Sequence, residues 1–171
     1  MEILFTPWRL AYLTGDAGRA VDECLFCGLH RLPDAEGLIV FRGTGVYAVL
    51  NRYPYSSGHL MVTPYAHHGT LTEMTPGERA ELMEVAATAE SILGEEYRCH
   101  GLNVGFNLGK SAGAGVPGHA HLHVVPRWDG DTSFITVVGG TRTLPEDLSD
   151  TRDRIAAGFA RRSPSRPEGS A

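Results

Sequence analysis

Three of the chain's eight histidines, His119, His121 and His123, occupy alternate positions in one short stretch. Because side chains alternate faces along a β-strand, a strand here would project all three imidazoles from one side. An imidazole titrates near neutral pH and can act as a nucleophile, a proton carrier or a metal ligand. The spacing therefore favours chemistry. The alternatives are the solvated face of an ordinary strand and a metal site like those of zinc hydrolases.

A glycine-rich stretch, residues 109–118, leads directly into the histidines. Glycines allow successive backbone N–H groups to converge on an anion, and we expect Gly113 and Gly115 to serve in this way. Lys110 and Ser111 add a positive charge and a hydroxyl group to the same stretch. Phosphate is the anion that these groups suit. The stretch lacks the spacing of a Walker phosphate loop, and a flexible surface loop is the alternative.

The cysteines form a second group with possible chemistry. Three cysteines are an odd number, and the first residues do not resemble a secretory signal, so a disulfide framework is disfavoured. Cys24 and Cys27 have Cys-x-x-Cys spacing, which suits a metal site, a redox pair or two buried thiols. Cys99 stands alone, and we interpret it as a small buried residue.

Length and composition limit the class of protein. The chain has 171 residues, of which 42% are apolar and 20% charged, as in ordinary globular domains. We expect one domain over residues 1–160 and a disordered polar tail over 161–171. The net charge of −5 disfavours nucleic acid or an anionic membrane as the main partner. No apolar stretch approaches the roughly 20 residues that cross a bilayer, so we expect a cytoplasmic protein.

The elements that must position the histidines can be read from hydrophobic patterns and turn signals. Thr75 begins a helix as its N-cap, with Pro76 at the first position and Glu78 completing a capping box, and this helix should end near Gly94. We expect strands over residues 38–41, 46–50, 59–63, 101–107 and 119–126, and a shorter helix over 145–159. This order predicts the α+β class, with one long and one shorter helix packed on an antiparallel sheet.

Three segments together resemble the histidine triad family of nucleotide hydrolases and transferases. Residues 119–125, His-Ala-His-Leu-His-Val-Val, are similar to the family signature. Residues 50–64 resemble its nucleoside-binding strand, loop and strand, and residues 125–134 resemble the bacterial branch related to diadenosine polyphosphate phosphorylases. The resemblance covers roughly residues 5–140. It implies a sheet that continues across a twofold axis in a homodimer.

The resemblance assigns a role to each histidine. His121 would attack the α-phosphorus of a nucleotide and form a covalent nucleotidyl-histidine, which a second acceptor resolves. A backbone carbonyl near His119 would fix the tautomer of the nucleophile, and His123 would help the leaving group to depart. The family requires no catalytic metal, because backbone N–H groups and imidazoles stabilise the phosphate charge.

The resemblance also implies ligands for the nucleoside. Asn51 stands where family members grip the ribose hydroxyls, and Asn107 matches a residue that contacts phosphate or ribose. For both residues the alternative is an asparagine that caps a loop. Relatives often carry a Gln-Ser or Gln-Thr pair before the triad, where this chain has Gly115-Val116. Phosphate contacts there would then come from the backbone, or from Lys110 and Ser111.

Some members of the family close a structural zinc site with two cysteines and two histidines. The matching residues here are Cys24, Cys27, His67 and His119, and His67 ends a Pro-x-x-His turn. His68 is the adjacent alternative. His59 has no such support, and we interpret it as a core or edge histidine with its hydrogen bonds satisfied.

The expected activity is cleavage of a dinucleoside polyphosphate, such as diadenosine tetraphosphate, with water or inorganic phosphate as the acceptor. A nucleoside phosphoramidate is an alternative substrate. Two other classes stay open: a nucleotide-binding signalling module without turnover, and a metal hydrolase that uses all three histidines as ligands.

Overall fold

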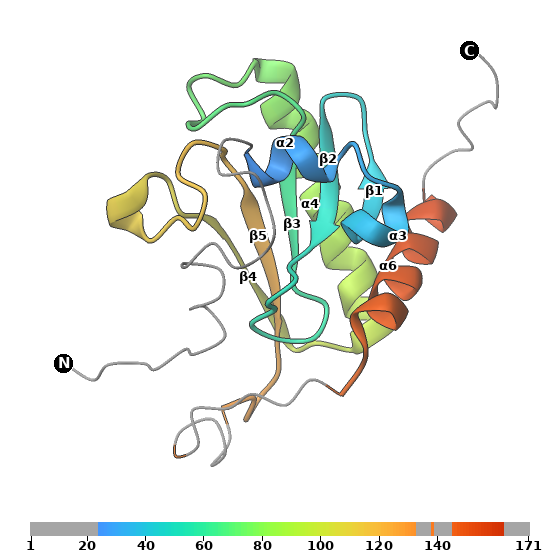
Figure 1. Ribbon diagram of the computed structural model, residues 1–171. Helices are drawn as coiled ribbons and strands as arrows, with labels where there is room; N and C mark the ends of the chain where they lie inside the picture. The colour runs from blue at the N-terminus through green and yellow to red at the C-terminus, as the bar shows by residue number, and fades with distance from the viewer. Residues whose placement is uncertain (1–23, 133–137, 139–144, 163–171) are drawn as a thin grey trace.

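The computed structural model describes residues 24–132, 138 and 145–162, which form one five-stranded antiparallel sheet with helices packed on it (Figure 1). The strands are β1 (Ile39–Arg42), β2 (Val46–Leu50), β3 (Leu60–Pro64), β4 (Gly101–Phe106) and β5 (Leu122–Arg127). Their order in the sheet is β1-β2-β3-β5-β4. The helices are α2 (Leu25–Leu29), α3 (Asp34–Gly37), α4 (Pro76–Tyr97) and α6 (Leu148–Arg162), with one 3-10 turn, η1 (Lys110–Ala112).

The predicted α+β class is confirmed, with α4 as the long helix and α6 as the shorter one. The hydrophobic pattern did not predict α2, α3 or the η1 turn. Arg161 and Arg162, the first residues of the expected tail, belong to α6, and residues 163–171 lie outside the described residues. The division into one domain and a tail stays a prediction.

The start of α4 follows its sequence signal. The Thr75 hydroxyl accepts a hydrogen bond from the Glu78 N–H, and the Glu78 carboxylate accepts one from the Thr75 N–H. This capping box satisfies two N–H groups that the first turn of a helix leaves without partners. The helix passes Gly94 and ends at Tyr97, where Arg98 adopts a left-handed conformation.

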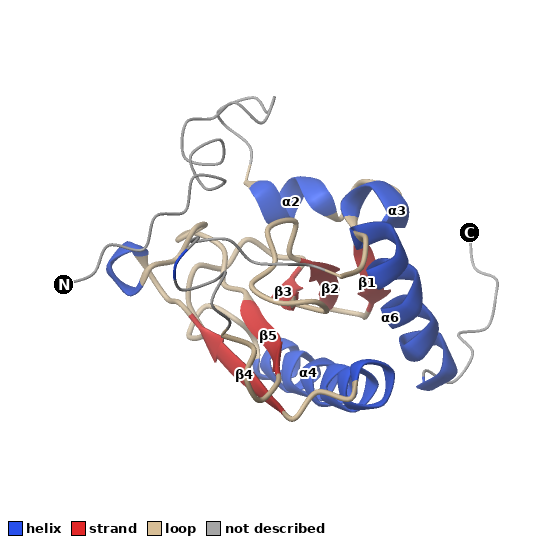
Figure 2. Cartoon of the chain, turned by 90° about the horizontal axis from the view of Figure 1, so that it is seen from below, coloured by secondary structure: helices blue, strands red, loops and turns tan. Residues whose placement is uncertain are grey.

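The sheet packs differently on its two faces, as Figure 2 shows with α4 on one side and α2 and α3 on the other. The α4 face carries the larger apolar core, which includes Leu122 and Val124 of β5. The opposite face packs against α2, with Tyr47, Val49 and Met61 around Phe26. His123 pairs in register with Met61, so it lies on the α2 face. The predicted alternation of β5 is therefore confirmed for residues 122–124.

The expected strand over residues 119–126 begins later than predicted, because β5 starts at Leu122 and its pairing with β3 ends there. Other hydrogen bonds hold the preceding residues to the end of β3 and to the turn that follows it. The Thr63 hydroxyl donates to the Ala120 carbonyl over 3.0 Å, and the Ala120 N–H donates to the His68 carbonyl over 2.6 Å. His119 and His121 therefore lie just outside the ladder, where their backbone groups can bond elsewhere.

No helix among the described residues is long and apolar enough to span a membrane.

The contact between α4 and α6 generates a prediction about two glycines. A Cβ atom on Gly158 of α6 would lie 2.6 Å from the buried Ile92 side chain of α4, whereas a Cβ on Gly94 would have nothing within 4 Å. Gly158→Ala should lower the free energy of unfolding by about 1–3 kcal/mol through overpacking. Gly94→Ala should raise it by about 0.5–1 kcal/mol, because alanine favours a helix. Urea denaturation measures both, and a stabilised Gly158→Ala protein would contradict the tight packing.

Candidate active site and metal cluster

His121 and His123 open onto a cavity of about 440 Å³ beside α2. Its apolar wall is formed by Leu25, Phe26, Leu29, Leu38, Leu50, Met61 and Val116. Its polar groups come from Asn51, Arg52, Tyr53, Tyr55 and Asn107. A mainly apolar cavity of this size with a few polar groups is typical of small-molecule sites. We call it the first cavity.

The structure brings most of the predicted nucleotide ligands to this cavity. Gly113 and Gly115 line it together with Asn51 and Asn107. Lys110 and Ser111 are exposed in η1, and neither lines the first cavity. In Figure 1 this turn, drawn in yellow, projects away from the sheet. Gly113 and Gly115 therefore lie closer to a ligand than the lysine does, but the N–H groups of Gly113 and Ala114 already donate to the carbonyls of Lys110 and Gly109. The phosphate roles of the glycines, Lys110 and Ser111 stay predictions.

Asn51 already has partners within its own loop. Its side-chain oxygen accepts a hydrogen bond from the Tyr53 N–H over 3.0 Å, and its amide nitrogen lies 3.4 Å from Nδ1 of His59. The loop-capping alternative is thus present in the structure. A role toward ribose would use the remaining hydrogen-bonding capacity of the same amide.

The tautomer of His121 is fixed by the backbone. Its Nδ1 lies 2.8 Å from the carbonyl oxygen of His119. Because a carbonyl only accepts, Nδ1 must carry the proton, and Nε2 of the neutral ring keeps its lone pair. His121 is 5% exposed, and burial lowers its pKa. His121 therefore carries an unprotonated Nε2, as a nucleophile requires.

His119 uses both ring nitrogens on structural partners. It is fully buried, and its Nε2 lies 2.9 Å from the carbonyl oxygen of Pro64, so Nε2 carries the proton. Its Nδ1 is left with a lone pair and lies 3.3 Å from Cys24 Sγ and 3.6 Å from Cys27 Sγ. Burial lowers the pKa of His119 to about 4, although the hydrogen bond to Pro64 opposes this shift. His119 therefore presents a neutral imidazole to the two sulfur atoms.

His123 has the opposite tautomer to His121, and His59 fixes it. The Tyr55 N–H donates to Nδ1 of His59 over 3.1 Å, so the proton of a neutral His59 ring is on Nε2. That nitrogen lies 3.0 Å from Nδ1 of His123 and donates to it. The proton of a neutral His123 is then on Nε2, and His123 carries an N–H that can donate a hydrogen bond to a leaving group.

His59 is the residue of the candidate site that sequence reasoning did not include. It is 1% exposed and fully hydrogen-bonded, as expected for a core histidine, but one of its partners is a triad histidine. A signal was present, since His59 precedes Met61 by two residues and shares its face, and Met61 pairs with His123. Reading that signal required knowing that β3 pairs with β5.

The four predicted metal ligands meet in one cluster. The ligand atoms of Cys24, Cys27, His67 and His119 all lie within 4.8 Å of one another. Cys27 Sγ is 3.3 Å from Nδ1 of His67. Tetrahedral zinc with two sulfur and two nitrogen ligands places each sulfur about 3.6 Å from each nitrogen. The donor types and their spacing therefore fit zinc, and neither cysteine is in a disulfide.

The surroundings of the cluster bear on two alternatives, namely His68 as a ligand in place of His67 and a metal held by all three triad histidines. His68 turns away from the cysteines, with its Nε2 3.8 Å from the Glu78 carboxylate, so His67 is the histidine that joins them. Among the described residues, the cluster of possible metal ligands includes His119 but neither His121 nor His123. The geometry does not favour a metal held by all three triad histidines.

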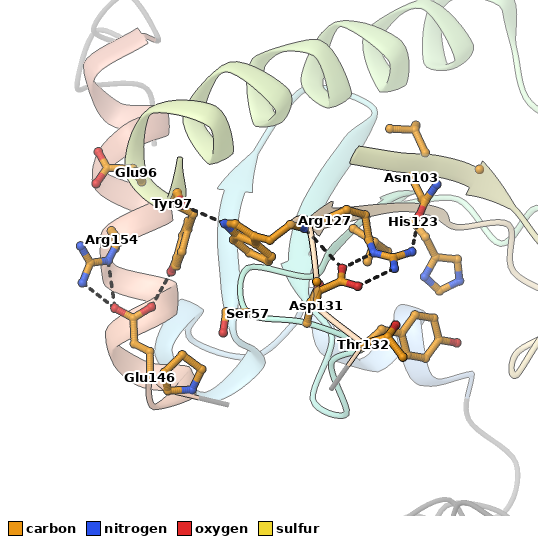
Figure 3. Close-up of a pocket in the computed structure, with 18 of the residues that line it drawn as sticks. Ser57, Glu96, Tyr97, Asn103, His123, Arg127, Asp131, Thr132, Glu146 and Arg154 are labelled. Carbon is orange, nitrogen blue, oxygen red and sulfur yellow. Dashed lines mark hydrogen bonds and ion pairs between the residues drawn. The ribbon is translucent and has the colours of Figure 1, made fainter. Parts of the chain in front are cut away.

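A second cavity, of about 1040 Å³, lies next to the first and shares Tyr55, Asn107 and His123 with it. Figure 3 shows that two arginines in its wall are paired with carboxylates. Arg127 donates to Asp131 and to Asn103, and Arg154 donates to Glu146. His123 therefore stands where the two cavities meet, with room on both sides for the two halves of an extended ligand.

The assigned tautomers can be measured directly. Long-range ¹H–¹⁵N correlation spectra should be recorded at a pH at which these histidine rings are uncharged. The His121 signals should then show a proton on Nδ1, and those of His59 and His123 a proton on Nε2. Single His→Gln variants would assign the signals. A proton on Nε2 of His121 would contradict the hydrogen bond to the His119 carbonyl.

Comparison with known proteins gives a consistent result. A model of the HIT domain matches residues 33–130. The AP-4-A phosphorylase of Mycobacterium tuberculosis is 45% identical over 167 residues, which cover 94% of this chain and 86% of that protein.

Solved structures of similar proteins point to the same family. A Zn-bound histidine triad family protein from Mycobacterium smegmatis superposes with a TM-score of 0.65 and 28% identity, over 81% of this chain and 94% of that one. A hypothetical histidine triad nucleotide-binding protein from Sulfolobus tokodaii gives the same score and identity, over 81% and 93%. The chain therefore belongs to the histidine triad (HIT) family.

Proposed function

We propose that this HIT-family enzyme cleaves a dinucleoside polyphosphate at the α-phosphate through a covalent nucleotidyl-histidine. The observation that carries the proposal is the pair of opposite tautomers at one cavity: His121 with a lone pair on Nε2 and His123 with a proton on Nε2. Such a pair supplies a nucleophile and a hydrogen-bond donor for the leaving oxygen without help from a catalytic metal.

The first step displaces a nucleotide. Nε2 of His121 attacks the α-phosphorus, and an N–P bond forms as the bond to the bridging oxygen breaks. The leaving oxygen takes the electron pair and accepts a hydrogen bond from the Nε2–H of His123, while the N–H donated by His59 holds that ring in place. Diadenosine tetraphosphate would release ATP and leave AMP on His121.

The second step returns the enzyme to its starting state. An oxygen of the acceptor attacks the same phosphorus, the N–P bond breaks, and His121 recovers its lone pair. When the acceptor is water, its proton is released to solvent. Phosphate as the acceptor yields ADP, and water yields AMP. The 45% identity to a protein named AP-4-A phosphorylase supports phosphate as the acceptor.

The first cavity would hold the nucleoside that becomes attached to His121. Its apolar wall suits a base, Asn51 and Asn107 suit ribose and phosphate oxygens, and Gly113 and Gly115 leave room for the phosphates beside them. The second cavity, on the other side of His123, would receive the leaving nucleotide.

We further propose that Cys24, Cys27, His67 and His119 hold a structural zinc ion. When bound, zinc supplies a cross-link between distant segments and no chemistry on the substrate. The donor set and its spacing support this proposal, as does the Zn-bound relative.

The described part of the sheet ends at β4, whose Val104 is 46% exposed. We propose that a second copy of the chain pairs there and extends the sheet into a homodimer, in line with the expectation from the family.

The nucleophile is tested with His121→Asn. This variant should lower kcat on diadenosine tetraphosphate by at least about 10³-fold and leave nucleotide binding intact, because only the attacking group is lost. Chromatography of the products with and without phosphate identifies the acceptor by ADP or AMP. A wild-type protein that binds nucleotides but turns none over would favour a signalling module instead.

The role of His59 is tested with His59→Gln on two substrates. If His59 positions the donor, kcat/KM on the phenyl ester of AMP should fall by about 10²-fold or more, since losing one hydrogen bond to a developing oxyanion costs on this scale. The p-nitrophenyl ester of AMP spreads the charge of its leaving oxygen onto the nitro group, so its kcat/KM should fall much less. Equal losses on both substrates would indicate a merely structural role.

The zinc site is tested by metal analysis of the purified protein. We expect one zinc ion per chain, lost in Cys27→Ser and retained in Cys99→Ser, because Cys99 lies outside the cluster. Wild-type protein that binds no zinc after loading would show that the four residues form only a hydrogen-bonded group.

A further inference from the structure

Helix α2 belongs to the metal cluster and to the first cavity at once. Cys24 is its N-cap and Cys27 lies within it, and both point to the cluster. Leu25, Phe26 and Leu29 of the same helix line the cavity. One short element therefore carries two metal ligands on one side and part of the proposed base-binding wall on the other.

This helix cannot hold its shape alone. It has five residues and no side-chain cap, and isolated helices shorter than about 12 residues are marginal in water. Its middle is attached to the sheet, where the Tyr47 hydroxyl donates to the Phe26 carbonyl over 2.7 Å. The following loop is attached through Arg42, which donates to the carbonyls of His30 and Leu32. Cys24 at the N-terminus of the helix lies against His119, and Cys27 within the helix lies against His67.

Phe26 connects the cluster to the nucleophile. Its side chain is 1% exposed, and its ring centroid lies 5.3 Å from that of His119 and 4.8 Å from that of His121. A displacement of α2 would remove this packing from His121 and open the apolar side of the cavity. The position of α2 therefore affects the nucleotide site even though the cluster is outside it.

We propose that α2 forms the wall of the nucleotide cavity only when Cys24 and Cys27 are tied to His67 and His119 through a bound zinc ion, so that nucleotide affinity depends on metal occupancy. This inference rests on the proposed nucleotide-binding function. By linkage, a bound nucleotide must then slow or weaken the loss of the metal to the same extent that the metal strengthens nucleotide binding.

The test uses AMP as the ligand and zinc alone as the metal. Calorimetry gives the Kd of AMP for zinc-loaded protein, for chelator-treated protein and for Cys27→Ser, with Cys99→Ser as the matched control. We expect the Kd to rise by about tenfold or more without zinc and in Cys27→Ser, because a wall that is docked a tenth of the time lowers apparent affinity tenfold. Cys99→Ser should match the wild type.

Hydrogen–deuterium exchange of the same samples distinguishes local undocking of α2 from destabilisation of the whole fold. Without zinc, amides of α2 should exchange faster while β2, β3 and α4 stay protected. AMP should also slow the transfer of zinc to a colorimetric chelator.

Three outcomes would overturn the inference. These are an unchanged Kd after zinc removal, exchange that rises throughout the sheet and α4, and zinc transfer that is insensitive to AMP. If the zinc-loaded protein itself failed to bind AMP, the proposed nucleotide function would fail instead, and the two failures are thereby distinguished.

Discussion

The site depends on one buried imidazole, that of His119, which contacts three parts of the molecule. Its Nε2 donates to the carbonyl of Pro64 at the end of β3, and its Nδ1 faces the sulfur atoms of Cys24 and Cys27. Its own carbonyl accepts the proton-bearing nitrogen of His121. A buried, uncharged ring with both nitrogens partnered costs little desolvation energy and fixes its neighbours firmly. The nucleophile is therefore oriented by the same residue that joins the metal cluster to the sheet.

Much of the fold could be predicted because local signals and tertiary packing agree. Thr75, Pro76 and Glu78 specify the start of α4 whatever lies around them, and the alternation at Leu122 and Val124 matches the buried face of β5. The start of β5 could not be predicted, because the residues before Leu122 bond outside the strand pairing. Ala120 accepts from the Thr63 hydroxyl and donates to the His68 carbonyl, and both partners are more than 50 residues away in the sequence. Helix α2 was missed because five residues carry no periodic signal, and its contacts with other segments hold it in place.

The residues of the site were easier to predict than their arrangement. Cys-x-x-Cys spacing and the family resemblance together indicated all four members of the metal cluster. Lys110 and Ser111 have suitable chemistry for phosphate, but the η1 turn holds them at the surface, outside the wall of the first cavity. Sequence gives the type of each side chain, whereas its direction is set by turns whose geometry depends on distant packing.

Three identical side chains acquire different chemistry because each Nδ1 meets a different partner. A carbonyl acceptor places the proton of His121 on Nδ1, and a donating imidazole places that of His123 on Nε2. The Nδ1 lone pair of His119 faces the two sulfur atoms, because the Pro64 carbonyl holds its proton on Nε2. None of these partners lies in the triad except the carbonyl of His119. The three histidines therefore acquire their roles from the residues around them, and His59 orients the N–H of His123 as the His119 carbonyl orients the lone pair of His121.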